Sequence, residues 1–324
     1  MKRLDTKRKF RVLFLQPKEY FLRLGFVLND DFDEDFGFFS LYQTLHKICD
    51  YDAVVTCIDH SHSSRYICRY AGSRGIPSIL VMDGIFEWSN AVANPFLKAN
   101  GIKLLSPCVY SEVMTIDAGL NAYINNSGQN SRMYSIGSQA VTSEECRKKS
   151  NFLVSTANKA YFTLEERDSL CLLMKDVVEC LKKGSYTYGF RIFDPYIKSY
   201  LGIHDDENHV DGTFEVNVDV FDCLITTPST IAQTAMERSM PVALLDYRDA
   251  PIFLNSGWRI NGRAPIEITL DSMRGRDDDR MRFQRDQICC ESLNSALLDS
   301  VGAGYLKADE EIGVDYLLRS RFIF

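Results

Sequence analysis

The first half of the chain alternates short apolar runs with amphipathic segments. Residues 11–17 (RVLFLQP), 52–59 (DAVVTCID) and 76–84 (IPSILVMDG) are apolar runs of strand length. Between them, residues 40–50 and 63–75 have apolar positions at helical spacing, and the second segment has a serine start and a glycine stop. Because apolar strands that alternate with helices pair in parallel with both sheet faces covered, this pattern predicts a Rossmann-like α/β fold.

A second alternation of the same kind begins at residue 151. Residues 151–157 and 186–195 read as strands, and the stretch 222–247 reads as strand, helix and strand. The segment 163–184 predicts a long amphipathic helix, with a capping-box pattern that starts at Thr163 and with lysines and a glycine at its end. The second half is therefore predicted to be Rossmann-like as well.

Apolar content falls over residues 137–150, where glycine, serine and charge increase. We therefore predict an N-terminal Rossmann-like domain over 1–145, a C-terminal one over 146–295, and a final segment, 296–324, that can cross back to the first domain. Two such domains place the carboxyl ends of two parallel sheets across a cleft, where open α/β sheets bind ligands. Asp83 ends a predicted strand on this cleft.

Composition narrows the function classes. The chain has 324 residues, which favours two domains of roughly 150 residues each. Hydrophobic residues make up 45% and charged ones 25%, as is typical of a globular protein with a large core. The formal net charge of -7 argues against nucleic acid as a partner, because phosphate backbones require a broad basic face.

The compartment is expected to be the cytoplasm. No run approaches the roughly 20 apolar residues of a membrane helix, and the start lacks the apolar segment of a signal peptide. Most of the cysteines lie in apolar stretches, as free thiols do in a reducing compartment. Basic residues among the first nine, with Arg319 and Arg321 in the tail, could contact an anionic membrane surface peripherally, or could be solvated termini.

The most informative stretch is residues 222–247. A predicted strand ends at Thr226, Thr227, Pro228, Ser229 and Thr230, and a helix follows at once. The start of a helix offers free backbone amides and a partial positive charge, and nearby hydroxyls add donors, so the loop suits a phosphate. The alternative is plain helix capping by Ser229 or Thr230.

The order of these segments resembles the donor half of GT-B glycosyltransferases, most closely the bacterial surface-polysaccharide branch with its glycerophosphotransferase, Kdo-transferase and sialyltransferase relatives. Residues 53–90, which include MDGIFEWSN, are similar to the acceptor half. The resemblance is one of order and spacing over roughly residues 9 to 255. It is carried in the second half by YSIGSQAV (134–141), the stretch 151–183, FRIFDPY (190–196) and CLITTPSTIAQTAMERSMPVALLDY (223–247).

The resemblance implies a catalytic role for Asp83, as base or nucleophile. Asp83 and Gly84 match the acidic-acidic-glycine motif of sialyl- and Kdo-transferases, with Met82 in place of the first acid. A carboxylate at a desolvated cleft can have its pKa raised toward the working pH, as a general base requires. Glu87 is a reserve acid, and a turn-capping aspartate is the alternative for Asp83.

Two positions depart from the donor-site pattern. Asp194 stands where the relatives have a histidine that touches the donor phosphate, so Arg191 or Lys198 could supply the missing positive charge. The family's ribose-binding glutamate is replaced by Thr234, and Glu237 lies three residues later. These departures put a cytidine-monophosphate donor in doubt and raise the possibility of a degenerate site.

A further loop, STANKAY, adds Ser155, Thr156 and Lys159 as candidate contacts to donor phosphates, or as an ordinary strand-to-helix loop. No metal site is expected: His60 and His62 alternate at a loop start and point apart in an extended chain. The sequence has no G-x-S-x-G, Walker A, G-x-G-x-x-G or C-x-x-C motif, which argues against elbow-type hydrolases, P-loop enzymes and ordinary dehydrogenases.

The resemblance predicts a metal-independent glycosyltransferase that has no cofactor. It would move a sugar from a nucleotide donor, CMP- or UDP-linked, to a bacterial surface glycan or lipid-linked acceptor at the inner membrane face. A nucleotide-sugar epimerase shares the two-domain plan and needs no acceptor. A catalytically silent scaffold subunit is the alternative that Asp194 and Thr234 favour.

Overall fold

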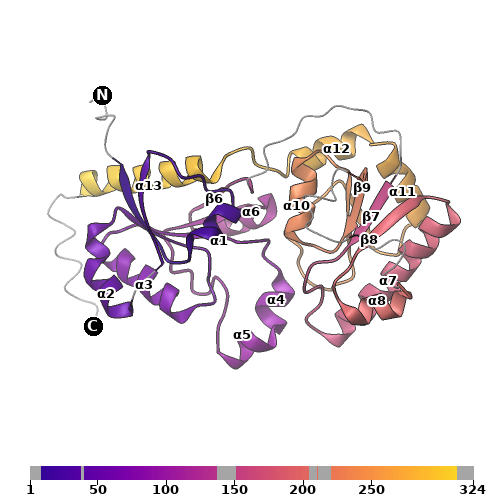
Figure 1. Cartoon of the computed structure of the whole chain (residues 1–324), viewed down its shortest axis with the longest axis horizontal. Coiled ribbons are helices and arrows are strands. Elements are labelled where there is room, and N and C mark those ends of the chain that lie inside the picture. The colour runs from indigo at the N-terminus through magenta and orange to yellow at the C-terminus, as the bar shows by residue number, and fades with distance from the viewer. Residues whose placement is uncertain (1–8, 38–39, 137–150, 204–209, 211–219, 312–324) are drawn as a thin grey trace.

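The computed structural model describes residues 9–37, 40–136, 151–203, 210 and 220–311. Its two parallel sheets confirm the predicted α/β class (Figure 1). The predicted domain boundary near 137–150 lies outside the described residues, as do the basic start at 1–8 and the tail at 312–324. Below, residues 9–136 form the N-terminal unit and residues 151–285 the C-terminal unit.

The N-terminal unit has a six-stranded parallel sheet in the order β2-β1-β3-β4-β5-β6. Its strands are β1 (Phe10–Phe14), β2 (Phe32–Phe36), β3 (Ala53–Thr56), β4 (Ser78–Val81), β5 (Glu112–Thr115) and β6 (Ser131–Met133). Its helices are α1 (Lys18–Arg23), α2 (Leu41–Lys47) with the 3₁₀ turn η1 (Ile48–Asp50), α3 (His62–Ser73), α4 (Trp88–Ala93), α5 (Pro95–Ala99) and α6 (Ala118–Asn126).

The C-terminal unit has a five-stranded parallel sheet in the order β11-β10-β9-β7-β8. Its strands are β7 (Asn151–Ser155), β8 (Thr187–Arg191), β9 (Cys223–Thr226), β10 (Val242–Leu245) and β11 (Trp258–Ile260). Its helices are α7 (Leu164–Lys183), α8 (Pro195–Leu201), α10 (Thr230–Glu237), α11 (Ile266–Arg274) and α12 (Asp278–Arg285).

The predicted long helix is α7. Thr163 is its N-cap and accepts a hydrogen bond from the Glu166 amide at 3.1 Å, and Gly184 is its C-cap. The Glu166 carboxylate accepts instead from the amide of Phe162, one residue before the cap. The buried face of α7, which includes Leu170, packs against the second sheet.

Strand β2, with the sequence FDEDF, has no counterpart among the predicted strands. Three of its five residues are acidic, so it lacks the apolar run that marks the central strands. It pairs in parallel with β1 at the edge of the sheet, where Phe32 is buried and packs against Phe26. An edge position leaves one side of a strand open to water, which suits charged side chains.

The last helix, α13 (Leu293–Glu311), packs against the first sheet rather than the second (Figure 1). Leu293, Leu297 and Val301 are buried in the same hydrophobic cluster as the residues of β1 and β3. Asn294 exchanges hydrogen bonds with the backbone of Val27 at 2.7 and 2.6 Å. The chain therefore returns to the N-terminal unit after completing the C-terminal one.

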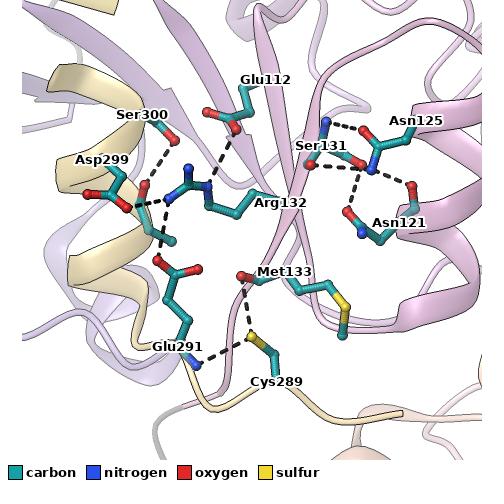
Figure 2. A network of polar contacts seen from close by, with 11 residues as sticks. Glu112, Asn121, Asn125, Ser131, Arg132, Met133, Cys289, Glu291, Asp299 and Ser300 are labelled. Carbon is teal, nitrogen blue, oxygen red and sulfur yellow. Dashed lines mark hydrogen bonds and ion pairs between the residues drawn. The ribbon is translucent and has the colours of Figure 1, made fainter. Parts of the chain in front are cut away.

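Arg132 fastens α13 to the edge of the first sheet (Figure 2). Its guanidinium lies 2.8 Å from Asp299 on α13, 3.4 Å from Glu291 just before this helix, and 3.9 Å from Glu112 on the neighbouring strand β5. Three carboxylates share this one cation, so the ion pair with Asp299 is part of a network of charges and not an isolated surface pair. Within the described residues, no helix is both long and apolar enough to cross a bilayer.

Candidate functional site

The carboxyl ends of β7 and β9 lie next to each other at the centre of the second sheet. The chain leaves β7 toward β8 on one side and returns to β9 on the other, so the strand order reverses between β7 and β9. Ligands bind at such a reversal in open α/β sheets. The residues that end the two strands there are Ser155 and Thr156 on one side, and Thr226 and Thr227 on the other.

Two of these hydroxyls hold the strand ends together. Thr227 Oγ1 accepts a hydrogen bond from the backbone amide of Ala157 at 2.8 Å, and Ser155 Oγ donates to the carbonyl of Arg191 at 3.0 Å. The hydroxyls of Ser155 and Thr227 therefore hold the backbone of these loops in position. Their predicted contact with a donor remains a prediction.

Four neighbouring side chains have buried polar atoms with no hydrogen-bond partner among the described residues. These atoms are Thr156 Oγ1, Thr226 Oγ1, Ser229 Oγ and both amide atoms of Gln233. Ser229 occupies the N-cap position of α10, yet its side chain makes no capping hydrogen bond. The capping alternative for Ser229 is therefore wrong, and we call these four residues the polar cradle.

Helix α10 separates the core of the C-terminal unit from the N-terminal unit. Its apolar positions, such as Ala232 and Met236, are buried in the second sheet's core. On the opposite face, the Glu237 carboxylate accepts hydrogen bonds from Ser135 Oγ at 3.0 Å and from the amide of Ile136 at 3.3 Å. Glu237 therefore bridges the two units, and its predicted contact with a donor ribose remains a prediction.

Thr234 stands where the resemblance places the ribose-binding glutamate. Its hydroxyl donates to the carbonyl of Thr230 at 3.3 Å, within the same helix. This intrahelical hydrogen bond occupies the hydroxyl, which is nearly buried.

The Asp83 turn lies against the start of α10. A Cβ added to Gly84 would stand 3.1 Å from Thr230 Oγ1, so the two loops are in contact. The hydroxyl of the buried Tyr134 donates a hydrogen bond to the carbonyl of Met82 at 2.6 Å, which holds the Asp83 turn in place. The structure thus brings together Asp83, Gly84 and Thr230, which lie far apart in the sequence.

The protonation of Asp83 is shifted by its surroundings. The residue has an exposed side, but the protein around it displaces enough water that desolvation raises the pKa of its carboxyl above 3.8. The positive charges of His60 and Arg23 oppose this shift. Asp83 is therefore a stronger base than an ordinary aspartate, and the residue after it, Gly84, contacts Thr230, the neighbour of Ser229 in the polar cradle.

Glu87 is part of a buried ion pair between the two units. Its carboxylate lies 2.5 Å from the Arg248 guanidinium, which also lies 3.8 Å from Glu166 and donates to the carbonyl of Ala160 at 2.6 Å. Desolvation raises the pKa of Glu87, and the charge of Arg248 opposes that rise. The reserve acid is thus engaged in joining the units, and its catalytic role remains a prediction.

Asp194 is the N-cap of α8. Its carboxylate accepts hydrogen bonds from the amides of Tyr196 and Ile197 at 2.9 and 3.0 Å, and from the Tyr161 hydroxyl at 2.9 Å. Two of these three donors are the first amides of the helix that Asp194 caps, and the third is a side chain outside it. The aspartate that replaces the family histidine therefore has a local structural role, whereas contact with a donor is still a prediction.

The two predicted cations differ in their surroundings. Arg191 is nearly buried at the end of β8, with its guanidinium 4.7 Å from the Phe193 ring centroid. Lys159 is exposed, and its ammonium lies 4.9 Å from the ring centroid of Phe162. Arg191 is thus the last residue of β8, the strand next to β7, while Lys159 lies in the loop after β7.

Two functional candidates were not predicted from the sequence. Arg248 follows β10 and belongs to no motif, so only the fold reveals its partners. Gln233 is a polar residue in an otherwise small and apolar stretch of α10, and its full burial could have been suspected from that position. Within the described ranges, no group of three metal-ligating side chains occurs.

Phe253 of the C-terminal unit inserts into the N-terminal unit. Its ring centroid lies 5.7 Å from that of Phe86 and 5.2 Å from that of Tyr123. At Gly119, near the start of α6, an added Cβ would stand 2.1 Å from the Phe253 carbonyl oxygen. Gly119 is therefore required for this close approach.

We expect Gly119→Ala to destabilise the protein by about 1–3 kcal/mol, because the methyl group overlaps the Phe253 backbone. Urea unfolding measures the loss. Gly72→Ala is the matched control: Gly72 also lies in a helix, α3, and its added Cβ meets nothing within 4 Å. There we expect a gain of up to about 1 kcal/mol. Equal effects at both positions would contradict the close approach.

The fold has solved counterparts. No protein-family model and no curated protein matches the sequence. A UDP-GlcNAc 2-epimerase from Neisseria meningitidis, solved with UDP-GlcNAc, has 10% identity and a TM-score of 0.52, over 93% of this chain and 100% of that one. A putative UDP-N-acetylglucosamine 2-epimerase from Listeria monocytogenes has 10% identity and a TM-score of 0.53, over 94% and 98%.

A glycosyltransferase is also among the solved structures to which this chain is similar. The calicheamicin glycosyltransferase CalG4 has 12% identity and a TM-score of 0.45, over 93% of this chain and 99% of that one. At such identities the likeness concerns the fold alone. The chain is a pair of parallel α/β sheets with GT-B-like structural neighbours.

Proposed function

We propose that the protein is a glycosyltransferase that uses a nucleotide-activated sugar. The observation that carries the proposal is the polar cradle beside the Asp83 turn. A buried polar group without a partner costs about 1–3 kcal/mol, so a ligand that binds these groups supplies what the fold leaves unsatisfied. Donor phosphates suit this place because it also includes the amide-rich start of α10.

In the proposed step, Asp83 accepts the proton of an acceptor hydroxyl as that oxygen bonds to the anomeric carbon of the sugar. The bond between this carbon and the donor phosphate oxygen breaks, and its electron pair leaves with the nucleotide. Negative charge develops on the phosphate, where the cradle and the first amides of α10 stabilise it. We therefore expect transfer to need no metal and to persist in EDTA.

The finer assignment is part of the same proposal. It places the protein near the Kdo-transferase, sialyltransferase and glycerophosphotransferase relatives, with a surface glycan or lipid-linked acceptor and peripheral contact at the inner membrane face. The Neisseria structure holds UDP-GlcNAc, which makes UDP-linked sugars the first donors to test. CMP-linked sugars are the second.

Thermal unfolding tests the phosphate cradle. Saturating CMP, UDP or their sugars should stabilise the protein by a few kcal/mol if they bind the folded state. Thr156→Val should lower nucleotide affinity about 10-fold or more, since a hydrogen bond to a charged group is worth about 1.5–3 kcal/mol. The same variant should leave the free protein as stable as before or more so, because it removes an unpartnered buried hydroxyl.

Thr44→Val is the matched control. Thr44 lies on α2, away from the second sheet, and its hydroxyl is also buried without a partner among the described residues. Its replacement should preserve the nucleotide affinity. If both variants bind nucleotides equally well, Thr156 does not contact the donor.

The second candidate is a nucleotide-sugar epimerase, which the whole-chain likeness to two 2-epimerase structures favours. NMR of the protein with UDP-GlcNAc alone separates the candidates. An isomerised sugar without any acceptor indicates the epimerase, whereas a reaction that requires an acceptor indicates the transferase. Failure to bind any nucleotide would instead favour the silent scaffold subunit.

A further inference from the structure

The N-terminal unit contains a cavity of about 780 Å³ that is separate from the polar cradle. It lies among α4, α5, α6 and the segment 101–108, and its lining is mostly apolar. A cavity of this volume is in the range that encloses an organic ligand. The apolar lining includes Phe86, Leu97, Ile102, Tyr123 and Ile124.

One wall of the cavity is held in place by a polar clamp. Leu105 has a φ of 54°, a conformation that is unfavourable for a side chain with a Cβ. Its amide donates to Asp59 Oδ2 at 2.6 Å, and Asp59 is nearly buried beside the Arg65 guanidinium at 2.8 Å. Arg65 also donates to the carbonyl of Pro107 at 2.8 Å. The wall is therefore fixed by tertiary contacts and not free to collapse into the cavity.

The charges on the lining have one sign. Lys98 and Lys103 line the cavity and are exposed, so they stand at its opening. No carboxylate is part of the lining, and neither lysine makes an ion pair with a described residue. A ligand with an apolar body and an anionic end matches this arrangement.

The cavity and the candidate site share one segment of chain. Phe86 and Trp88 line the cavity, and they also line a much smaller cavity with Pro228 and Arg248 of the C-terminal unit. Pro228 directly precedes Ser229 of the polar cradle, and Asp83 lies three residues before Phe86. A ligand in the large cavity is thus next to the segment that carries the candidate base.

We propose that this cavity binds the hydrocarbon chain of an anionic amphiphile, with its phosphate or carboxylate head beside Lys98 and Lys103. Burial of the methylene groups supplies most of the affinity, and the lysines select the charge. The identification of this amphiphile as the sugar acceptor rests on the proposed function, but its binding does not.

Fluorescence of Trp88 reports on the binding directly. The chain has two tryptophans, and the other, Trp258, is buried in the core of the second sheet. We expect decyl phosphate, titrated into the full chain below its critical micelle concentration, to shift the Trp88 emission to shorter wavelength. Trp88→Phe should abolish the shift. An unchanged emission together with no heat in calorimetry would overturn the proposal.

Matched probes and variants separate the two parts of the site. Decanol should bind at least 5-fold more weakly than decyl phosphate, and inorganic phosphate should give no shift. Ala91→Phe, which places a ring in the cavity, should weaken decyl phosphate binding at least 10-fold. The double variant Lys98→Gln, Lys103→Gln should fold normally, because both lysines are exposed, and should bind decyl phosphate and decanol alike.

Each result that differs from these expectations contradicts one named part of the proposal. Equal binding of decanol and decyl phosphate by the parent would overturn the anionic head, and a shift with inorganic phosphate would overturn the apolar body. Thr156→Val should bind decyl phosphate as the parent does. If the parent protein binds nucleotides but not decyl phosphate, this inference alone is contradicted. If it binds decyl phosphate but no nucleotide, the proposed function alone is contradicted.

Discussion

Asp83→Asn is expected to lower sugar transfer by about 10²–10⁴-fold, the usual contribution of a general base. The amide keeps the size and shape of the side chain but cannot accept the proton of the acceptor hydroxyl. Nucleotide affinity should change little, because the polar cradle belongs to the other unit. Steady-state rates and thermal shifts with the same donor measure the two effects separately.

The pH profile gives this prediction a second readout. Desolvation raises the pKa of Asp83 above the ordinary 3.8, so the protonated and inactive form persists to higher pH than for a solvated aspartate. For the parent protein, kcat/KM should therefore rise with pH through a limb that lies above pH 3.8. In Asp83→Asn the residual rate should lose this limb.

Asp117→Asn is the control for this substitution. Asp117 is buried just after β5, the strand next to β4, and burial raises its pKa to about 6. It is the N-cap of α6 and accepts from the Leu120 amide at 2.7 Å, a role that asparagine also fills. Transfer should continue in this variant. If Asp83→Asn retained transfer while nucleotide still bound, Asp83 would not be the base.

The fold was largely predictable because its strands are buried on both faces. β1, β3, β4, β7 and β9 are covered by helices, so each is a continuous apolar run with clear ends. The acidic edge strand β2 escaped this pattern, since an edge strand has no need of a purely apolar sequence. Strand order follows from packing rather than from local pattern.

The sequence could predict that the two loops of the candidate site lie together, but it could not predict the contacts of their side chains. The hydroxyl-rich loop from Thr227 to Thr230 and the Asp83 turn were found because parallel strands place their carboxyl-end loops at one edge. Which hydroxyls already form a hydrogen bond within the protein depends on neighbours that are distant in the sequence, as the bond between the Ala157 amide and Thr227 shows. The pairing of Glu87 with Arg248 joins residues from different units, and no local pattern encodes it.

Arg248→Met is expected to lower the free energy of unfolding by about 3–5 kcal/mol, the usual cost of removing one partner from a buried ion pair. The Arg248 side chain is only 4% exposed, and its carboxylate partners Glu87 and Glu166 are 13% and 12% exposed. Methionine matches the length of the stem but leaves two buried carboxylates without their cation. Urea unfolding at pH 8 measures the loss.

The pH dependence of that loss identifies its cause. With Arg248 in place, desolvation already raises the pKa of Glu87 above 4.5, and the guanidinium limits the rise. Without the guanidinium, the folded pKa rises further while the unfolded value stays the same. The charged form of Glu87 then destabilises the folded state. This penalty is absent below the pKa that Glu87 has in the unfolded chain, and it grows as pH rises through its pKa in the folded state. The loss of stability should therefore be smaller at pH 5 than at pH 8.

Glu87→Gln tests whether Glu87 serves the ion pair with Arg248 or takes part in catalysis. Arg248 keeps Glu166 and the Ala160 carbonyl in this variant, so the loss of stability should be smaller than in Arg248→Met. If Glu87 only joins the two units, Glu87→Gln retains transfer; loss of transfer with stability intact would instead make it the catalytic acid. A pH-independent loss in Arg248→Met would mean that packing, rather than the buried charges of Glu87 and Glu166, accounts for its effect.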